Sequence, residues 1–270
     1  MKIICLVKFV PNLDLRNDVK AEANRKSGNI QRAGPKQVIN PEDASALAYA
    51  LGLKKESPAT TVEVLSMGPA NLAEKLKDLV RIGADKAVLI TDPSYAASDS
   101  YATSLILSSY LQKANFDFLF TGTKTLDGET GHIGPQVAEA LNLDQFSNVQ
   151  TILEMTMKQI EFEADFENEI IRARMSCPAV ISVGDHFNSG QKLGFVKYDD
   201  LGREVGNQFI QLSNSDLQVD LSQVGRKGSP TIVRHEVAAR ERKKKTTRHL
   251  LLDNQAIDEV YEFLKENHYV

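Results

Sequence analysis

Short apolar runs alternate with amphipathic stretches through the first half of this sequence. The first run, residues 2–9, is almost continuously apolar, which is typical of a strand buried on both faces of a parallel sheet. Further strands are expected at residues 60–66, 86–90 and 117–120, and helices lie between them. Because parallel neighbours are joined by right-handed crossover helices, this alternation predicts an α/β fold with a doubly wound, mostly parallel, Rossmann-like sheet. Asn40 is expected to be the N-cap of the first helix.

The sequence after the fourth expected strand is the candidate for chemistry. Residues 121–136 read Thr-Gly-Thr-Lys-Thr-Leu-Asp-Gly-Glu-Thr-Gly-His-Ile-Gly-Pro-Gln and lead into a helix with an apolar stripe. In open α/β sheets, ligands bind beyond the carboxyl ends of strands, and a helix that begins there presents N–H groups to an anion. Gly128, Gly131 and Gly134 allow close backbone approach, so a phosphate-binding loop is predicted. The spacing matches neither GxGxxG nor GxxxxGK[ST], and a glycine-rich connection that merely turns the chain is the alternative.

In the second half of the chain, short strands follow one another without the alternating helices of the first half. Further strands are expected at residues 149–153, 159–164, 169–175 and 179–183, a turn at 27–29, and an extended segment at 231–237. Residues 188–220 are polar and weakly periodic, which predicts a surface excursion. The last helix, 254–267, carries an apolar face that needs a partner. We therefore expect a nucleotide-binding domain over residues 1–187, a partner-recognition excursion over 188–220, and a C-terminal arm with a helix over 221–270.

Composition and charge narrow the function classes. The chain has 42% hydrophobic and 25% charged residues, without a leader-like segment or a membrane-length apolar run, so a cytoplasmic protein without a membrane span is expected. The formal net charge of -4 argues against nucleic-acid binding, and the basic run at 240–248 lacks aromatic residues that stack on bases. Cys5 and Cys177 give no disulfide framework, and no metal-ligand spacing is found.

Six short motifs follow one another along the chain. They are Val7-Lys8-Phe9-Val10-Pro11, Asn40-Pro41-Glu42-Asp43, Ser66-Met67-Gly68-Pro69, Gly83-Ala84-Asp85-Lys86-Ala87, Ser98-Asp99-Ser100-Tyr101-Ala102-Thr103 and the run from Asp127 to Gln136. With these motifs the chain resembles the β subunit of electron-transfer flavoproteins over most of its length. The resemblance implies an obligate heterodimer in which the C-terminal arm packs on an α subunit that holds its own FAD.

The resemblance also implies an adenine nucleotide in the α/β domain. Ordinary members bind AMP there as a structural ligand, whereas electron-bifurcating members bind a second FAD that accepts hydride from NADH. The Asp-Gly-Glu-Thr-Gly-x-x-Gly-Pro form is similar to the second group, so we expect FAD, with NAD(H) as substrate. The flavin, rather than a catalytic side chain, is expected to carry electrons to a flavin-dependent dehydrogenase and a low-potential carrier such as ferredoxin. A simple carrier with AMP at this site, or a nucleotide-binding regulatory module without flavin, is the alternative.

The motif match implies which residues hold the nucleotide. The adenosine end is expected to contact Lys8, Phe9, Val10, Asn40, Asp43, Ser66 and Met67, of which Phe9 and Met67 are equally well explained as core. The phosphates are expected to contact Gly122, Thr123, Asp127, Gly128, Glu129, Thr130, Gly131, His132, Ile133, Gly134, Pro135 and Gln136. Asp99 and Thr103 are expected beside the flavin, although Ala97 stands where the family usually has glycine.

Residues 188–203 depart most from the family pattern. Members commonly carry an Asn-Glu-Pro-Arg segment and a leucine that anchors the partner dehydrogenase, and neither can be matched here. The local sequence Lys-Leu-Gly-Phe-Val-Lys-Tyr-Asp-Asp-Leu is most similar to variants that accompany a flavin-dependent lactate dehydrogenase. Leu193, Phe195 and Tyr198 are the candidate anchors, and the alternative is that they cover the α subunit.

Overall fold

The computed structural model describes residues 1–12, 37–167, 169–188, 190–231, 250, 253–266 and 269. The chain divides into two units, Met1–Arg234 and His235–Val270. The turn expected at 27–29, the extended segment expected beyond Thr231, and the basic run at 240–248 lie outside the described residues.

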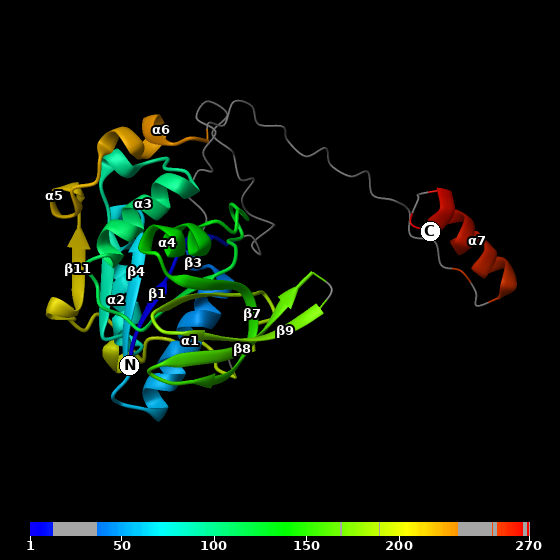
Figure 1. The fold of residues 1–270 in the computed structure, drawn as a ribbon, viewed down its shortest axis with the longest axis horizontal. Coiled ribbons are helices and arrows are strands. Elements are labelled where there is room, and N and C mark those ends of the chain that lie inside the picture. Colours follow the sequence, from blue (N-terminus) through cyan, green and yellow to red (C-terminus); the bar gives the residue numbers. More distant parts are fainter. Residues whose placement is uncertain are drawn as a thin grey trace. The chain divides into compact units, whose positions relative to one another are not determined.

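Nine strands of the described residues form one sheet in the first unit (Figure 1). They are β1 (Lys2–Leu6), β4 (Thr61–Met67), β5 (Lys86–Ile90), β6 (Phe118–Gly122), β7 (Asp144–Met155), β8 (Gln159–Phe166), β9 (Glu169–Ser176), β10 (Ala179–Val183) and β11 (Phe209–Leu212). Their spatial order is β11-β5-β4-β1-β6-β10-β7-β8-β9. Pairing is parallel from β11 to β7 and antiparallel among β7, β8 and β9. The predicted α/β fold with a mostly parallel sheet is therefore confirmed.

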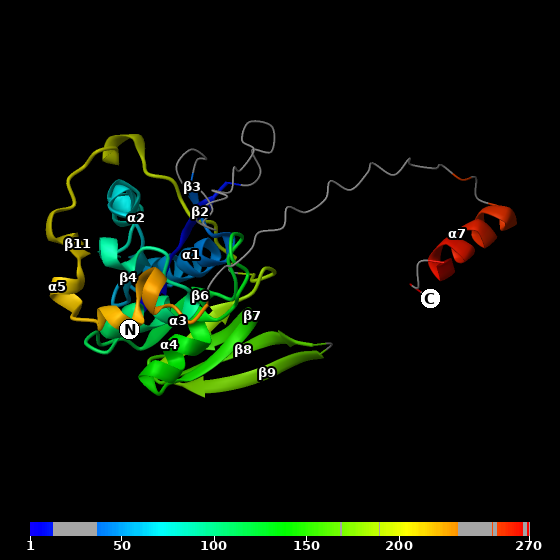
Figure 2. The ribbon, with the colours of Figure 1, turned by 90° about the horizontal axis from the view of Figure 1, so that it is seen from above.

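Helices cover both faces of the sheet (Figure 2). One face carries α1 (Pro41–Glu56) and α2 (Ala73–Arg81), and the other carries α3 (Ser100–Leu111) and α4 (Ile133–Leu141). Leu119 and Phe120 are neighbours in β6 but belong to different core clusters, since successive side chains of a strand point to opposite faces. The short 3₁₀ helices are η1 (Ala70–Leu72), η2 (Pro93–Tyr95), η3 (Tyr198–Asp200), η4 (Gly206–Gln208) and η5 (Leu221–Gln223), and α6 (Gly225–Gly228) is a single α-helical turn.

The strand order changes direction beside β1. From β1 the chain moves to β4 and then β5 on one side, and the connection through α3 returns it to β6 on the other side. In open sheets of this kind, a crevice lies beyond the carboxyl ends of the strands at such a switch point. The loops after β1 and β6 therefore meet where a ligand is expected.

Two strand boundaries differ most from the expected ones. The first apolar run is divided: β1 ends at Leu6, and Phe9–Pro11 form β2, which pairs antiparallel with β3 (Gln37–Ile39). The Lys8 N–H donates to Asp43 Oδ2 at 2.9 Å instead of to a neighbouring strand, which accounts for the break. Strand β7 begins at Asp144 rather than at residue 149, because its first residues pair with β10.

The expectation that residues 188–220 form a surface excursion is wrong for their second part. Residues Phe209–Leu212 form β11, which pairs in parallel with β5 at the edge of the sheet, and α5 (Asn214–Leu217) follows. A four-residue edge strand is too short to show a hydrophobic period, and its partner lies far earlier in the chain. Tertiary pairing, rather than local pattern, makes this strand.

The second unit contains α7 (Asn254–Glu266), within the range expected for the final helix. Three residues of its expected apolar face, Ile257, Val260 and Tyr261, are 62%, 46% and 54% exposed. None of the described helices is long and apolar enough to cross a membrane.

Candidate functional site

The carboxyl ends of β1, β4, β6 and β10 lie at one edge of the sheet, as their parallel register requires. Two side-chain contacts join the segments that follow them. Lys8 Nζ, after β1, lies 2.6 Å from Asp127 Oδ1 in the loop after β6. Ser100 Oγ, at the start of α3, lies 3.1 Å from His132 Nδ1 in the same loop. The loop predicted to bind phosphate is thus the place where β1 and α3 also converge.

The start of α1 organises the first part of this loop. Three almost fully buried side chains of α1 and its cap each accept a backbone N–H from the loop: Asp43 Oδ1 from Gly122 at 2.7 Å, Glu42 Oε2 from Lys124 at 2.7 Å, and Asn40 Oδ1 from Leu126 at 3.2 Å. The second oxygen of Asp43 accepts the Lys8 N–H. One carboxyl group therefore joins the loops after β1 and β6.

Asn40 occupies the N-cap position predicted for it, but its side chain does not cap the helix. Its amide Nδ2 donates to the Lys124 carbonyl at 2.9 Å, while Oδ1 accepts from Leu126. The motif therefore identified the helix start correctly. The hydrogen bonds of the Asn40 side chain go to the loop after β6 instead of to the first turn of α1. The polar atoms of Asn40 and Asp43 are directed to backbone in this structure, and their contact with adenosine stays a prediction.

Gly122 lies where a larger residue does not fit. An ideal Cβ there would be 2.6 Å from Asp43 Oδ1 and 2.7 Å from Glu42 Cβ. Burial raises the pKa of Asp43 to about 7, although the N–H groups of Lys8 and Gly122 oppose the shift. Burial likewise raises the pKa of Glu42 above its usual range, against the opposing N–H and charge of Lys124. The anchoring carboxyl of Asp43 therefore titrates near neutral pH.

Lys8, which follows β1, also contacts the first part of the loop after β6. Its Nζ lies 3.5 Å from Thr125 Oγ1, and the Thr125 hydroxyl donates to Asp127 Oδ1 at 2.9 Å, the oxygen that Lys8 also contacts. The Asp127 side chain is 7% exposed and that of Lys8 is 35% exposed. The Asp127 side chain is shielded from solvent, whereas the Lys8 side chain is partly exposed.

Residues 128–132 form the exposed part of the loop. Glu129 and Gly131 have φ angles of 50° and 65°, in the left-handed region. The N–H groups of Thr130, Gly131 and His132 make no hydrogen bond to any residue in the described part of the chain. Successive N–H groups in left- and right-handed conformations form a concave anion site, and the first turn of α4 adds further donors. This arrangement fits a phosphate group.

The three glycines of the motif have different surroundings. Among described residues, an ideal Cβ on Gly128 meets only Thr125 Oγ1 at 3.6 Å, and one on Gly131 meets only the Thr123 carbonyl at 3.5 Å. A Cβ on Gly134 would overlap the Ser182 hydroxyl. We therefore assign Gly134 to the close packing of α4 on β10, and Gly128 and Gly131 to the open side of the loop.

The Thr123 hydroxyl is engaged by the protein. It accepts the Asn148 N–H at 3.0 Å and donates to the Ser182 carbonyl at 3.3 Å. The first turn of α4 contains the remaining predicted phosphate contacts, Ile133, Pro135 and Gln136. Ile133 packs against the core cluster of α3 and α4. Gln136 Oε1 is buried without a hydrogen-bond partner among the described residues.

The predicted adenosine contacts on β2 and β4 are mostly core residues. Phe9 and Val10 are buried, and Phe9 belongs to the cluster under α1 and α2. Met67 packs against the opposite cluster. Ser66 is 1% exposed, and its hydroxyl has no hydrogen-bond partner among the described residues. Of these residues, only Ser66 has an unused polar group.

Asp99 is the N-cap of α3, and both of its oxygens accept backbone N–H groups. Oδ1 accepts from Ala102 at 2.9 Å and Oδ2 from Thr231 at 2.8 Å. Thr103 lies half-buried near the start of the same helix. Ala97, which stands where the family usually has glycine, has a φ of 61°. Ala97 therefore adopts the left-handed conformation that glycine usually adopts.

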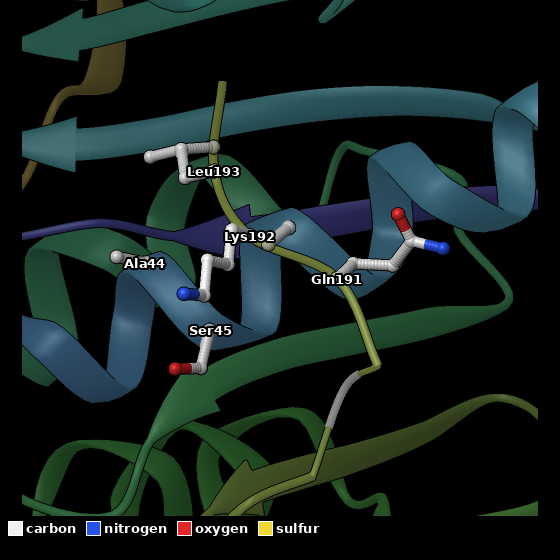
Figure 3. A pocket seen from close by; sticks show the side chains of 6 residues that line it. Ala44, Ser45, Gln191, Lys192 and Leu193 are labelled. Atoms are coloured by element: carbon white, nitrogen blue, oxygen red, sulfur yellow. The ribbon is translucent and has the colours of Figure 1, made fainter. Parts of the chain in front are cut away.

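The three candidate partner anchors lie in different environments, and Figure 3 shows that of Leu193. The segment after residue 190 crosses α1, where a hollow of about 170 Å³ is lined by Ala44, Ser45, Ala48, Gln191, Lys192 and Leu193. This hollow is smaller than ligand pockets, which enclose about 300 Å³ or more. Leu193 packs partly buried against the core cluster of α1, whereas Phe195 and Tyr198 are 93% and 87% exposed. Leu193 fastens the segment to α1, and the two aromatic rings face solvent.

Two residues of the site have roles that sequence reasoning did not assign. Glu42 stands inside a matching motif, but its hydrogen bond to Lys124 depends on the tertiary structure. Ser182, at the end of β10, is 1% exposed and its hydroxyl has no partner among the described residues. The only signals in the sequence were the place of Glu42 in the motif Asn40-Pro41-Glu42-Asp43 and that of Ser182 in the strand expected at residues 179–183.

Comparison with known proteins identifies the family. The family model "Electron transfer flavoprotein domain" matches residues 27–193. The electron transfer flavoprotein subunit beta of Thermoanaerobacterium thermosaccharolyticum is 31% identical over 238 residues, which cover 86% of each chain. The caffeyl-CoA reductase-Etf complex subunit CarD of Acetobacterium woodii is 30% identical over 215 residues, 75% of this chain and 80% of CarD. Protein FixA of Azotobacter vinelandii is 32% identical over 250 residues, 90% of this chain and 85% of FixA. The chain therefore belongs to the electron transfer flavoprotein family, among its β subunits.

Proposed function

We propose that this chain holds FAD at the carboxyl edge of β1 and β6, exchanges electrons with NAD(H), and works as the β subunit of a heterodimeric electron transfer flavoprotein. The observation that carries the proposal is the form of the loop after β6. Its first part is tied to α1, and its second part offers the N–H groups of Thr130, Gly131 and His132 without partners among the described residues. A rigid support beneath unpaired donors suits an anion such as a pyrophosphate.

The residues present fit a phosphate-bearing nucleotide. The Lys8 side chain is partly exposed beside the loop, and the hydroxyls of Ser66 and Ser182 are buried without partners among the described residues. A bound FAD would supply hydride exchange with NAD(H), while the chain binds it and controls access. AMP would use the same donors for its single phosphate. A single-FAD carrier with structural AMP in this chain is therefore the alternative.

Two observations favour FAD over AMP. Gly128 and Gly131 leave the outer side of the loop open, which gives space for a dinucleotide. The relative CarD is named as part of a caffeyl-CoA reductase-Etf complex. We infer that this chain also serves a complex that couples NAD(H) to a flavin-dependent dehydrogenase and a low-potential carrier such as ferredoxin. The sequence of residues 188–203 favours a dehydrogenase that acts on lactate.

The partner surfaces lie in separate parts of the chain. The exposed apolar residues of α7, Ile257, Val260 and Tyr261, favour contact with the α subunit. Phe195 and Tyr198 favour contact with the dehydrogenase, because large exposed aromatic side chains commonly dominate binding energy at interfaces. Leu193 supports this surface from below through its contact with the core.

The nucleotide content of the purified heterodimer tests the proposal. The complex, co-expressed with its α subunit, should release FAD from each subunit and no AMP, and NADH should bleach the flavin of this chain under anaerobic conditions. Gly131→Val should remove the FAD of this chain and leave that of the α subunit, because a β-branched side chain at a φ of 65° is strained and occupies the open side of the loop. Released nucleotides are separated by chromatography and counted.

Gly190→Val is the matched control. Gly190 has a φ of 63°, and none of the described residues lies within 4 Å of its ideal Cβ, so the substitution brings similar backbone strain outside residues 122–136. This variant should keep the flavin of both subunits. AMP in this chain, together with no reaction with NADH, would contradict the FAD proposal and support the simple carrier. Equal flavin loss from both variants would mean that strain alone, rather than the loop, is responsible.

A further inference from the structure

The loop between β5 and α3 has an aspartate at each end, and each aspartate caps the helix that follows it. Asp92 Oδ1 accepts the Ser94 N–H at 2.9 Å in η2. Asp99 Oδ1 accepts the Ala102 N–H at 2.9 Å in α3. N-cap aspartates commonly act in this way. In each carboxylate, one oxygen is left for another donor.

The second oxygen of each aspartate binds a segment that returns from the end of the first unit. Asp92 Oδ2 accepts the Asn214 N–H at 3.0 Å, and Asp99 Oδ2 accepts the Thr231 N–H at 2.8 Å. The donors lie 122 and 132 residues later in the sequence. A single short loop therefore holds the polypeptide at two points on its way to the C-terminal arm.

The contact at Asp99 is reinforced by a chain of hydrogen bonds. The Asp99 N–H donates to Ser229 Oγ at 2.9 Å, and the Ser229 hydroxyl donates to the Gly225 carbonyl at 2.7 Å. The Gly225 N–H donates to Ser98 Oγ at 2.9 Å, which returns the chain of bonds to the loop. Ser229 is 6% exposed, and a Cβ on Gly225 would overlap the Ser94 carbonyl. Residues 225–231 are therefore seated closely on the loop.

We propose that Asp99 is a positioning residue that fastens residues 225–231, the start of the C-terminal arm, to the first turn of α3. The family resemblance places Asp99 beside the flavin, but both of its oxygens are already used by backbone donors. Ser100, the next residue, contacts His132 in the nucleotide loop. We call the hydrogen bonds of Ser98 and Asp99 to residues 225–231 the clasp. The clasp therefore holds the start of the arm on the same helical turn that contacts the proposed nucleotide site. Only the link between the clasp and the nucleotide site rests on the proposed function.

Asp99→Asn separates the two roles of this side chain. The asparagine oxygen can still cap α3, because Asn is as good an N-cap as Asp, but its amide nitrogen cannot accept the Thr231 N–H. Amide hydrogen exchange, read at single residues in the complex with the α subunit, should become about tenfold faster at Thr231, as expected for the loss of a charge-assisted hydrogen bond. Exchange at Ala102 should be unchanged, because the asparagine oxygen still accepts its N–H.

Two further variants make the test specific. Ser229→Ala removes the acceptor of the Asp99 N–H without touching the cap, and should also speed exchange at Thr231. Asp92→Asn is the matched control on the same loop, and should speed exchange at Asn214 but not at Thr231. Wild-type protection of Thr231 in both Asp99→Asn and Ser229→Ala would overturn the proposal. Loss of nucleotide from Asp99→Asn with Thr231 still protected would also overturn it and make Asp99 a ligand contact. A wild-type complex without nucleotide would instead contradict the proposed function, and the exchange measurements would still decide the clasp.

Discussion

The two parts of the loop after β6 are built in opposite ways. In residues 122–127, backbone N–H groups donate to buried side chains of α1 and its cap, and Lys8 pairs with Asp127. In residues 128–132, the side chains are exposed or small, two residues have positive φ, and the N–H groups of Thr130, Gly131 and His132 find no acceptor among the described residues. One part is satisfied by the protein, and the other has the donors that we propose for the ligand.

This contrast shows how a short loop can be both rigid and receptive. The anchored part limits the movement of the backbone, so ordering the loop costs less when a ligand binds. In the open part, no side chain of α1 accepts these N–H groups, and they have no partner among the described residues. Changes in the anchored part should therefore act on stability, and changes in the open part on nucleotide binding.

The largest expected effect comes from Asp43→Asn, as a change in the pH dependence of stability. The pKa of Asp43 is raised to about 7 by burial, compared with about 3.9 in an unfolded chain. The folded state then binds more protons between these values, so the wild-type chain should lose up to about 4 kcal/mol of stability as pH rises from about 4 to about 7. Asparagine does not titrate, so the variant should be less stable than wild type by a larger margin at about pH 5 than at about pH 8. Denaturant unfolding of the complex at both pH values measures this margin.

Asp185→Asn is the control for the Asp43 experiment. Asp185 lies near the same edge, 4.0 Å from Lys124 Nζ, but its side chain is 55% exposed. Its substitution should change stability little and by a similar amount at both pH values. A margin for Asp43→Asn that does not change with pH would mean that burial does not raise the pKa of Asp43 in the folded chain.

Gly122→Ala and Gly128→Ala compare the two parts of the loop directly. A methyl group at residue 122 would lie under 3 Å from Asp43 and Glu42, so we expect a loss of about 1–3 kcal/mol, as for overpacked cores. A methyl group at residue 128 meets only Thr125 Oγ1 among the described residues, so stability should change by less than about 0.5 kcal/mol. Thermal unfolding of complexes freed of this chain's nucleotide measures both effects. Equal destabilisation by the two variants would remove the distinction between anchored and open parts.

The smallest expected effect is a gain of stability in the variant Ala97→Gly. Ala97 has a φ of 61°, similar to the 65° of Gly131, yet carries a Cβ. Ala97→Gly removes a left-handed strain of about 1–2 kcal/mol but adds backbone entropy to the unfolded chain, so a net gain of about 0.5 kcal/mol is expected. Asn142→Gly, at a φ of 53°, should gain less because asparagine tolerates this conformation. A lower melting temperature for Ala97→Gly would show that the alanine side chain contributes packing that outweighs the strain.

Much of the fold follows from local pattern. The boundaries of β5 and β10 agree with those expected, because each is a short apolar run between turn signals. The helix after Asn40 also begins where Asn40, as N-cap, and Pro41, as first helical residue, predict it. The pattern fails at β11, whose hydrogen bonds come from β5, and at the break between β1 and β2, where Asp43 takes the Lys8 N–H.

The sequence by itself determined the alternation of strands and helices, the position of the loop at a strand end, and membership of the electron transfer flavoprotein family. These properties depend on residue spacing and on motifs that can be read along one dimension. The tertiary structure decided that Asn40, Glu42 and Asp43 hold the loop, that Gly134 packs against Ser182, and that Leu193 is fastened while Phe195 is exposed. Each of these roles is a hydrogen bond, a close contact or a burial between residues far apart in the chain, and such pairings exist only after the sheet has brought its strand ends together.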